Sequence, residues 1–208
     1  IAGSLTATGQ IYLINQNGIV FADGAKVNTN TLIASSLVIT DQLFKDGYLT
    51  NVLNKGVVPA FSGEGGFVKV ETGAELNGSR IMMFAPVVEN NGVISTPDGG
   101  QTVLAAGHKV YLEASKDPNL RGVLVEVDVT NPGVAEAGVV TNAGEIISER
   151  GNITLAGFAV NQQGRISATT SVTENGSVKL LARYGVETVE NINTKPSIYD
   201  IRATKTGK

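Results

Sequence analysis

A repeat of about twenty residues constrains the fold of this chain more than any other feature. "VVENNGVISTPDGGQTVLAAG" (87–107) and "VVTNAGEIISERGNITLAG" (139–157) share one order: two valines, an Asn-x-Gly turn, a strand with isoleucine, a polar glycine corner and a Leu-Ala segment. Looser copies occupy residues 68–85 and 158–182. This period predicts a solenoid in which each repeat forms one coil and stacks on its neighbours.

The glycine spacing and the short strands support the same fold. The turn glycines Gly73 and Gly92 lie 19 residues apart, and Gly144 and Gly164 lie 20 apart. In "NQNGIVFADGAKVNTNTLIAS" (15–35), Asn and Gly cut the chain into several strands of about three to five residues, which are unstable without neighbours on both sides. Stacked coils supply those neighbours. We therefore predict an all-β fold, a right-handed parallel β-helix, because parallel crossovers are almost always right-handed.

Alignment of the repeats predicts which side chains stack between coils. The predicted aliphatic columns are Val93 or Ile94 over Glu145 or Ile146 and then Ile166, and Leu104 over Leu155 and Leu181. Asn90, Asn142 and Asn161 recur at one corner, which predicts an amide ladder along the axis. For any single position, a common turn residue is an equally good interpretation.

Two segments interrupt the repeat. Within residues 37–66, "TDQLFKDG" (40–47) has an N-cap candidate in Thr40 or Asp41 and a stop at Gly47, which predicts one or two helical turns. Within residues 119–138, valines alternate with other residues from position 123 to 129, and this period of two predicts a short antiparallel strand outside the coils, turned at Asn131-Pro132-Gly133. We expect one β-helical domain over residues 1–185, with 186–208 as a C-terminal tail or the start of a continuation.

Composition excludes several classes of function. A net charge of -3 with scattered Lys and Arg disfavours nucleic acid as a partner, because phosphate binding needs clustered cations. The chain contains no cysteine, so disulfides and thiolate metal sites are excluded. No apolar run reaches the roughly 18 residues of a membrane-spanning helix, and the N-terminus lacks the regions of a signal peptide, which predicts a cytosolic protein or a mature piece of a larger one.

Many parallel β-helices are enzymes that cleave polysaccharides, but the acidic residues of this sequence give little support for such an activity. Glycoside hydrolysis needs two carboxylates close together, whereas the acids are spread out and typical of solvent-facing positions: Glu71, Glu75, Glu89, Asp98, Glu126 and Asp128. His108, the one histidine, follows a corner glycine and has no neighbouring Ser, Cys or acidic partner in the sequence, which is typical of a surface or corner residue. We predict no enzymatic activity, no metal and no cofactor.

The stretch 15–35 resembles the secretion domain of two-partner-secretion exoproteins, the filamentous haemagglutinin family of Gram-negative bacteria. That family carries an Asn-Pro-Asn-Gly-Ile motif, which Asn15, Asn17, Gly18 and Ile19 match, while Gln16 replaces its proline. The likeness continues at Ala25, Val27, Asn28, Ala34 and Ser35, and residues 88–113 resemble the later coils of the family and its extra-helical strand.

The resemblance implies the N-terminal secretion module of a large exoprotein or adhesin, secreted to the cell surface after crossing the periplasm unfolded. Its partner would be an outer-membrane transporter that recognises residues 15–19 through periplasmic domains, and coil stacking would then nucleate folding. The family's Asn-Pro-Asn-Leu motif and β cap have no counterpart in residues 1–14, so we expect that cap region to be missing.

Two alternatives stay open. Asn17-Gly18 is also typical of a turn that only stabilises one coil. The β-helix is alternatively a segment that binds a host carbohydrate or receptor directly, with tyrosines as the stacking residues. The candidates are Tyr12, Tyr48, Tyr111 and Tyr184.

Overall fold

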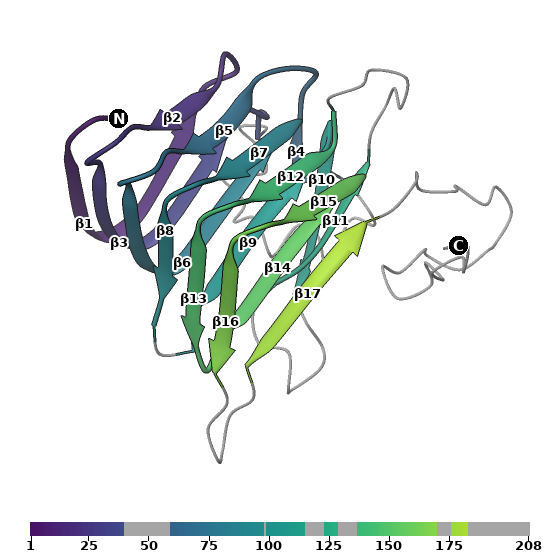
Figure 1. Ribbon diagram of the computed structural model, residues 1–208. Coiled ribbons are helices and arrows are strands. Elements are labelled where there is room, and N and C mark those ends of the chain that lie inside the picture. Colours follow the sequence, from purple (N-terminus) through teal and green to yellow (C-terminus); the bar gives the residue numbers. More distant parts are fainter. Residues whose placement is uncertain (40–58, 98, 115–122, 129–136, 170–175, 183–208) are drawn as a thin grey trace, which may run out of the picture.

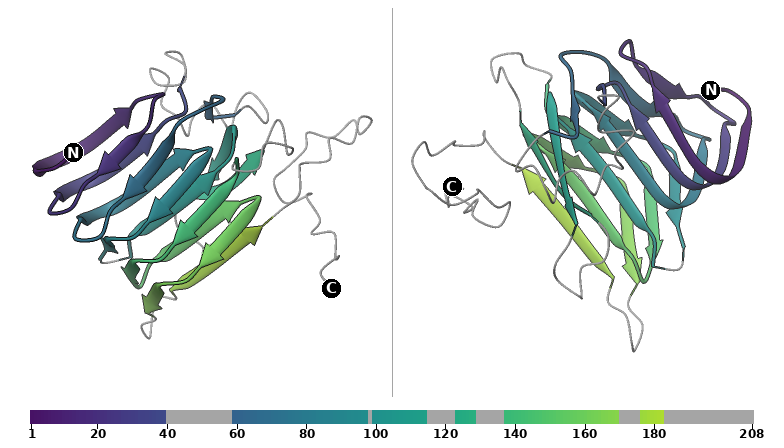
Figure 2. Two further views of the ribbon diagram at one scale, coloured as in Figure 1. Left: turned by 45° about the horizontal axis from the view of Figure 1, so that its top comes forward. Right: turned by 180° about the vertical axis from the view of Figure 1, so that it is seen from behind.

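The computed structural model describes residues 1–39, 59–97, 99–114, 123–128, 137–169 and 176–182. These residues form strands, turns and bends, with no helix among them. Short parallel strands stack along one axis, from the purple N-terminal coil to the yellow-green C-terminal strand (Figures 1 and 2). The predicted class is confirmed: a right-handed parallel β-helix with a few antiparallel strands outside the coils.

Each coil has three faces, which two parallel sheets supply. One sheet forms the first face, in the order β15-β12-β7-β5-β2. Its strands are β2 (Ile19–Phe21), β5 (Phe67–Val70), β7 (Val87–Asn90), β12 (Val139–Asn142) and β15 (Ala159–Gln162). The larger sheet bends and forms the other two faces. Its strands are β1 (Ser4–Ile14), β3 (Lys26–Ser35), β6 (Glu75–Ala85), β8 (Val93–Thr96), β9 (Gln101–Ala106), β13 (Glu145–Glu149), β14 (Asn152–Gly157), β16 (Arg165–Thr169) and β17 (Ser177–Ala182).

The early coils contain longer strands than the sequence predicted. β1, β3 and β6 have 11, 10 and 11 residues, and β6 pairs with both β8 and β9, so one long strand covers two faces. The expectation that residues 26–35 form separate short strands is therefore wrong. β1 and β3 are paired on both sides of a register shift between Ala7 and Gln10. In a later coil Pro97, which has no N–H to donate, separates β8 from β9.

The register confirms the first predicted column and corrects the second. Val93 pairs with Glu145, and Ile94 pairs with Ile146, which pairs with Ile166. Leu104 pairs with Leu155 as expected, but Leu155 pairs with Leu180, while Leu181 pairs with Ala156 and packs against a different cluster. The sequence has two adjacent leucines here, and a shift of one residue moves a side chain to the opposite face of a strand.

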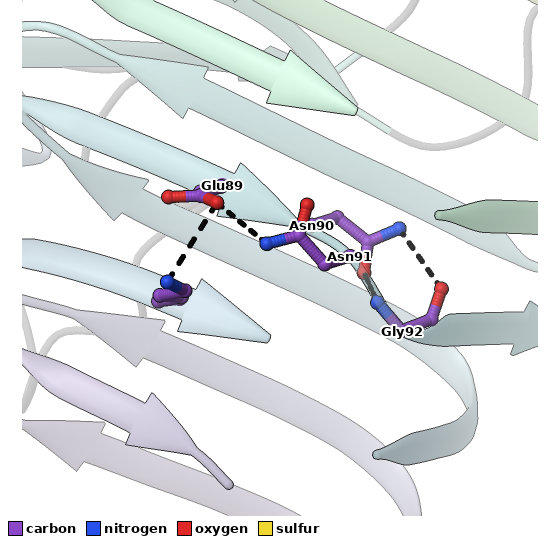
Figure 3. Close-up of polar contacts among 5 residues, drawn as sticks. Glu89, Asn90, Asn91 and Gly92 are labelled. Carbon is purple, nitrogen blue, oxygen red and sulfur yellow. Dashed lines mark hydrogen bonds and ion pairs between the residues drawn. The ribbon is translucent and has the colours of Figure 1, made fainter. Parts of the chain in front are cut away.

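A buried amide ladder occupies one interior column of the first face. The Asn90 amide donates to the Asn142 amide oxygen at 2.7 Å, and Asn142 donates to Gln162 at 3.0 Å. Asn90 also bonds the backbone of Gly92 at the same corner (Figure 3). The predicted third rung, Asn161, is wrong: it pairs with Thr141 on the outer side and is exposed.

The corner glycines stack directly over one another. Gly92, Gly144 and Gly164 follow the first face in successive coils, and a Cβ added to Gly164 would overlap the carbonyl oxygen of Gly144 and lie 2.6 Å from the carbonyl carbon of Ala143. Backbone contact between coils leaves no room for a side chain at this corner. The predicted spacing of Gly144 and Gly164 therefore has a steric cause. The predicted pair Gly73 and Gly92 is wrong, because Ala74 is the residue that lies under Gly92.

A small antiparallel sheet covers the outside of one face. It consists of β11 (Val123–Asp128), β10 (Lys109–Ala114) and β4 (Phe61–Ser62), in the order β11-β10-β4. This confirms the predicted antiparallel strand in segment 119–138. Beneath the sheet lies a second apolar cluster, in which the rings of Phe61 and Phe84 have centroids 4.8 Å apart. The predicted helical turns at 40–47, the turn at 131–133 and the tail 186–208 lie outside the described residues.

Candidate recognition site

The four residues 15–18 form the corner that joins β1 to β2. The side chains of Asn15, Gln16 and Asn17 are exposed, and Gly18 is half-buried. Ile19 is 7% exposed and belongs to the core inside the coils. The structure therefore divides the five predicted residues into an exposed polar corner and one apolar residue that packs inside. We call residues 15–18 the recognition corner.

Local hydrogen bonds close the recognition corner. The Gly18 N–H donates to the Asn15 carbonyl oxygen at 2.9 Å, and the Asn17 N–H donates to the Asn15 side-chain oxygen at 3.1 Å. The second bond is an Asx turn, in which an asparagine side chain substitutes for a backbone acceptor. Gln16 takes the second position of this turn, where proline is common. The corner thus closes through Asn15 without the fixed φ of a proline.

The backbone of Gly18 has a φ of +116°, a value that L side chains rarely adopt. The corner is also joined to the next coil, because the Asn15 N–H donates to the Ser35 carbonyl at 3.0 Å. Substitution of Gly18 would strain the corner by its backbone conformation alone.

Residues of a neighbouring coil pack against the recognition corner. The Ser36 hydroxyl donates to the Gly65 carbonyl at 3.0 Å. Gly66 has a φ of +83°, and a Cβ there would lie 2.6 Å from the Ser36 Cβ and would overlap the Gln16 carbonyl oxygen. A Cβ on Gly18 would lie 3.0 Å from the Phe67 ring. Gly66 and Phe67 were not predicted as part of this site; the glycine cluster at positions 63–66 was the available signal.

The other family-like residues have mostly structural positions. Ala25, Val27 and Ala34 are fully buried inside the coils. Ser35 is buried as well, and its hydroxyl donates to the Leu37 carbonyl at 2.9 Å and accepts from the Leu37 N–H at 3.0 Å. Asn28 faces solvent and accepts a hydrogen bond from Asn77 at 3.3 Å. Among the described family-like residues of the stretch 15–35, the recognition corner is the part with consecutive exposed polar side chains.

Three of the acidic residues considered for catalysis form ion pairs with lysines. Glu75 pairs with Lys26 at 3.7 Å, and Glu89 pairs with Lys69 at 3.7 Å (the Glu89 contacts are drawn in Figure 3). Asp128 similarly pairs with Lys109 at 3.9 Å. In the described ranges, no three His, Cys, Asp or Glu side chains are grouped as a metal site would require. Those ranges also hold no helix with the length and apolarity to cross a membrane.

His108 lies at a corner, as predicted, but it is not a surface residue. Its side chain is 6% exposed, and its Nε2 lies 4.0 Å from the Glu64 carboxylate, so the expectation that His108 has no acidic partner is wrong. The backbone explains this burial. The His108 N–H donates to Asp128 and its carbonyl accepts from Gly63, so the extra-helical strands close over the residue.

Two of the four tyrosine candidates for carbohydrate stacking lie among the described residues, and they are on different strands. Tyr12 and Tyr111 are half-buried on β1 and β10, and Tyr12 packs against the cluster under the extra-helical sheet. Burial raises the pKa of both phenols, and Asp128 raises the pKa of Tyr111 further. Tyr48 and Tyr184 lie outside the described residues.

Comparisons with known proteins agree with the geometry. The family model described as TPS secretion domain matches residues 1–192. The solved HMW1 secretion domain from Haemophilus influenzae is similar, with a TM-score of 0.69, 26% identity, and coverage of 88% of this chain and 45% of that chain. The heme/hemopexin-binding protein of Haemophilus influenzae is 28% identical over 154 residues, which are 68% of this chain and 16% of that protein.

The chain therefore spans less than half the length of these two relatives. TPS domains belong to exoproteins that are secreted through the outer membrane, and they engage an outer-membrane transporter as their partner. The family match covers most of the chain and includes the recognition corner. This chain belongs to the TPS secretion domains of two-partner-secretion exoproteins.

Proposed function

We propose that this domain is the N-terminal secretion module of a larger exoprotein, and that the periplasmic domains of its outer-membrane transporter recognise Asn15, Gln16 and Asn17. The observation that carries this proposal is the recognition corner itself. Three consecutive side chains with hydrogen-bonding groups face solvent on a turn that the backbone and Asn15 hold closed. A closed turn presents these groups with little further loss of conformational entropy on binding. Ile19 has a different role, because it is buried inside the coils.

The same domain nucleates folding after the chain crosses the outer membrane to the cell surface. Each coil adds aliphatic side chains to interior columns, and each buried aliphatic contributes roughly 1.5–3 kcal/mol before chain entropy is subtracted. One such column runs through the pairs Leu5–Val27, Val27–Leu76, Leu76–Ile94 and Ile94–Ile146. Each folded coil exposes the strand edges on which the next coil pairs. Folding at the cell surface therefore favours outward movement of the chain through the outer membrane. The module extends over residues 1–185, the boundary at which the sequence loses its period.

The experiment replaces Asn15 and Asn17 together with alanine and measures two quantities: affinity for the periplasmic domains of the transporter and the free energy of unfolding. We expect binding to weaken roughly tenfold or more, because each lost hydrogen bond contributes about 0.5–1.5 kcal/mol. Secretion should fall in parallel.

Asn91→Ala is the matched control. Asn91 also precedes a glycine at a coil corner, but it lies between β7 and β8, where its side chain donates to Glu89 (Figure 3). We expect this variant to keep normal affinity. If the double variant loses stability but binds the transporter as well as the parent does, the corner is only a structural turn and the recognition proposal is wrong.

A further inference from the structure

We propose that residues 186–190 form a further strand of the extra-helical sheet and pair with the open edge of β11. The sequence of this segment is Val-Glu-Thr-Val-Glu, and it follows β17 after three residues. The proposal concerns a contact within the folded chain and is independent of the transporter. It rests on an open strand edge, on the cover that β17 lacks, and on a repeat that leads this segment to that edge.

The open edge belongs to β11, which ends the extra-helical sheet and has β10 as its neighbour. In an antiparallel pair, the backbone groups of alternate residues point away from the neighbouring strand. The Gln101 side chain bonds the N–H and the carbonyl of Val123, so Val123 is such a residue. Val125 and Val127 follow it at intervals of two. Outside β10, no described residue is hydrogen-bonded to the backbone N–H and carbonyl groups of Val125 and Val127.

The pairing of β10 agrees with this alternation. Val110 is opposite Val127, and its carbonyl accepts from the Ala60 N–H on the side of β4. The backbone groups of Val110 and Val127 therefore point away from each other. A strand edge of this kind is usually paired or covered in native proteins, because it can otherwise pair with other chains.

The open edge faces the later coils. β11 contacts both β9 and β14, while β10 and β4 lie on its other side. Neighbouring strands are about 4.8 Å apart in both sheets, so one further outer strand would lie over β14 and β17. The outer residues of β14 are at most 6% exposed: Asn152, Thr154 and Ala156. Their partners on β17 are only half-buried: Ser177, Lys179 and Leu181. The outer face of β17 thus lacks the cover that β14 has.

A repeat in the chain leads residues 186–190 to this position. Gln101 of β9 and Ser177 of β17 both pair with Asn152, so the two strands are equivalent at an offset of 177 − 101 = 76 residues. β9 is followed by a corner and then by β10. The same offset aligns β10 with residues 185–190. Because β17 lies two coils after β9, the equivalent of β10 lies two strands further along the outer sheet, directly beyond β11.

The residues of the segment suit this place. Val186 aligns with Val110 and Thr188 with Leu112, and both β10 residues are buried beneath the outer sheet. Valine and threonine are also β-branched residues, which favour strands. The segment would therefore put Val186 opposite Val127 and Thr188 opposite Val125, while Gln101 already bonds Val123.

The strand lies outside the coils, so it adds to the proposed module of residues 1–185 without extending its helical part. The family match continues to residue 192 and so includes the segment. Its pairing would close the β11 edge and thereby protect the folded domain from pairing with other chains.

A disulfide tests the position of the segment, because the chain contains no cysteine of its own. Val127→Cys and Val186→Cys are introduced together in the whole chain. Opposite residues of an antiparallel pair have Cα atoms about 4.5–5.5 Å apart, within the range of a disulfide. We expect an intramolecular disulfide on mild oxidation. Val127→Cys with Thr204→Cys is the control and should form none. Equal cross-linking in the two variants, or a disulfide only between two molecules, would overturn the proposal.

Hydrogen exchange tests the pairing itself. The amides of Val125 and Val127 should exchange slowly in the parent chain, and Thr188→Pro, which removes an N–H from the strand, should accelerate them at least about tenfold. Exchange in β13 should not change. Thr204→Pro is the matched control and should leave β11 as it is. Fast exchange of both amides in the parent, or no effect of Thr188→Pro, would show that the segment does not cover the edge. Protection that depends on protein concentration would assign the edge to a second copy and also overturn the proposal. Neither measurement involves the transporter, so failure here leaves the proposed function standing.

Discussion

Asn142 shows how a single polar residue is accommodated inside an aliphatic solenoid. Its side chain is fully buried, donates to Gln162 and accepts from Asn90. In the same column of the earlier coils, Phe21 pairs with Val70, which pairs with Asn90. The column therefore changes from apolar to amide along the axis. Each amide is stable there because its neighbours in adjacent coils satisfy it.

We predict that Asn142→Ala lowers the free energy of unfolding by about 1–3 kcal/mol, because Asn90 and Gln162 then lose buried partners. Asn161→Ala is the control. It removes an exposed amide one residue before Gln162, and it should change stability by less than about 0.5 kcal/mol. Urea unfolding followed by circular dichroism measures both. Equal effects of the two substitutions would contradict the ladder.

At the scale of elements, a side chain of the coils is hydrogen-bonded to the start of β11. The Gln101 amide donates to the Val123 carbonyl at 2.7 Å, and its oxygen accepts from the Val123 N–H at 3.0 Å. Gln101 thus bonds the first residue of β11 much as a neighbouring strand would. This attachment holds the extra-helical sheet over Val103 and Phe84, which are fully buried beneath it.

We predict that Gln101→Ala loosens β11 while the coils stay folded. The two backbone groups of Val123 would lose their buried partners, which contribute roughly 1 kcal/mol each. Hydrogen exchange should therefore accelerate at the amides of Val123–Asp128 but not at those of β13. Gln163→Ala, at an exposed corner position, is the matched control and should leave exchange in β11 unchanged. Uniformly faster exchange in every strand would argue against a local attachment.

At the scale of the whole molecule, apolar stacking outweighs charge. Within the described part of the chain, three ion pairs join adjacent coils on the outside: Lys26–Glu75, Lys69–Glu89 and Glu145–Arg165. All six side chains are at least 32% exposed, and such pairs contribute about 0–1 kcal/mol each. The interior columns, in contrast, contain fully buried aliphatic residues in consecutive coils.

We therefore predict that stability is nearly independent of salt. Raising NaCl from about 0.05 M to about 0.5 M screens exposed pairs, yet it should change the free energy of unfolding by less than about 1–2 kcal/mol. Urea titrations at the two salt concentrations measure this directly. A loss of several kcal/mol at high salt would show that the pairs, not the columns, hold the coils together.

The sequence by itself determined the class of fold and most of the stacking register. Its twenty-residue period predicted the stacked coils, and the pairs Ile94–Ile146 and Ile146–Ile166 followed from aligning the repeats. The period carries this information because vertical stacking puts equivalent residues in direct contact. The likeness at residues 15–19 also predicted the family, although the transporter contact remains a proposal.

Only the tertiary structure decided two kinds of feature. The first is which of two adjacent residues points into the coil, and the second is which distant segments are in contact. Two adjacent leucines, or Asn161 beside Gln162, look equivalent in sequence, yet strand alternation places one inward and the other outward. The neighbour of the recognition corner was also decided by the tertiary structure, because Phe67, which lies against Gly18, comes from another coil. Local patterns define each coil, but the side chain that completes a surface is decided when one coil packs on the next.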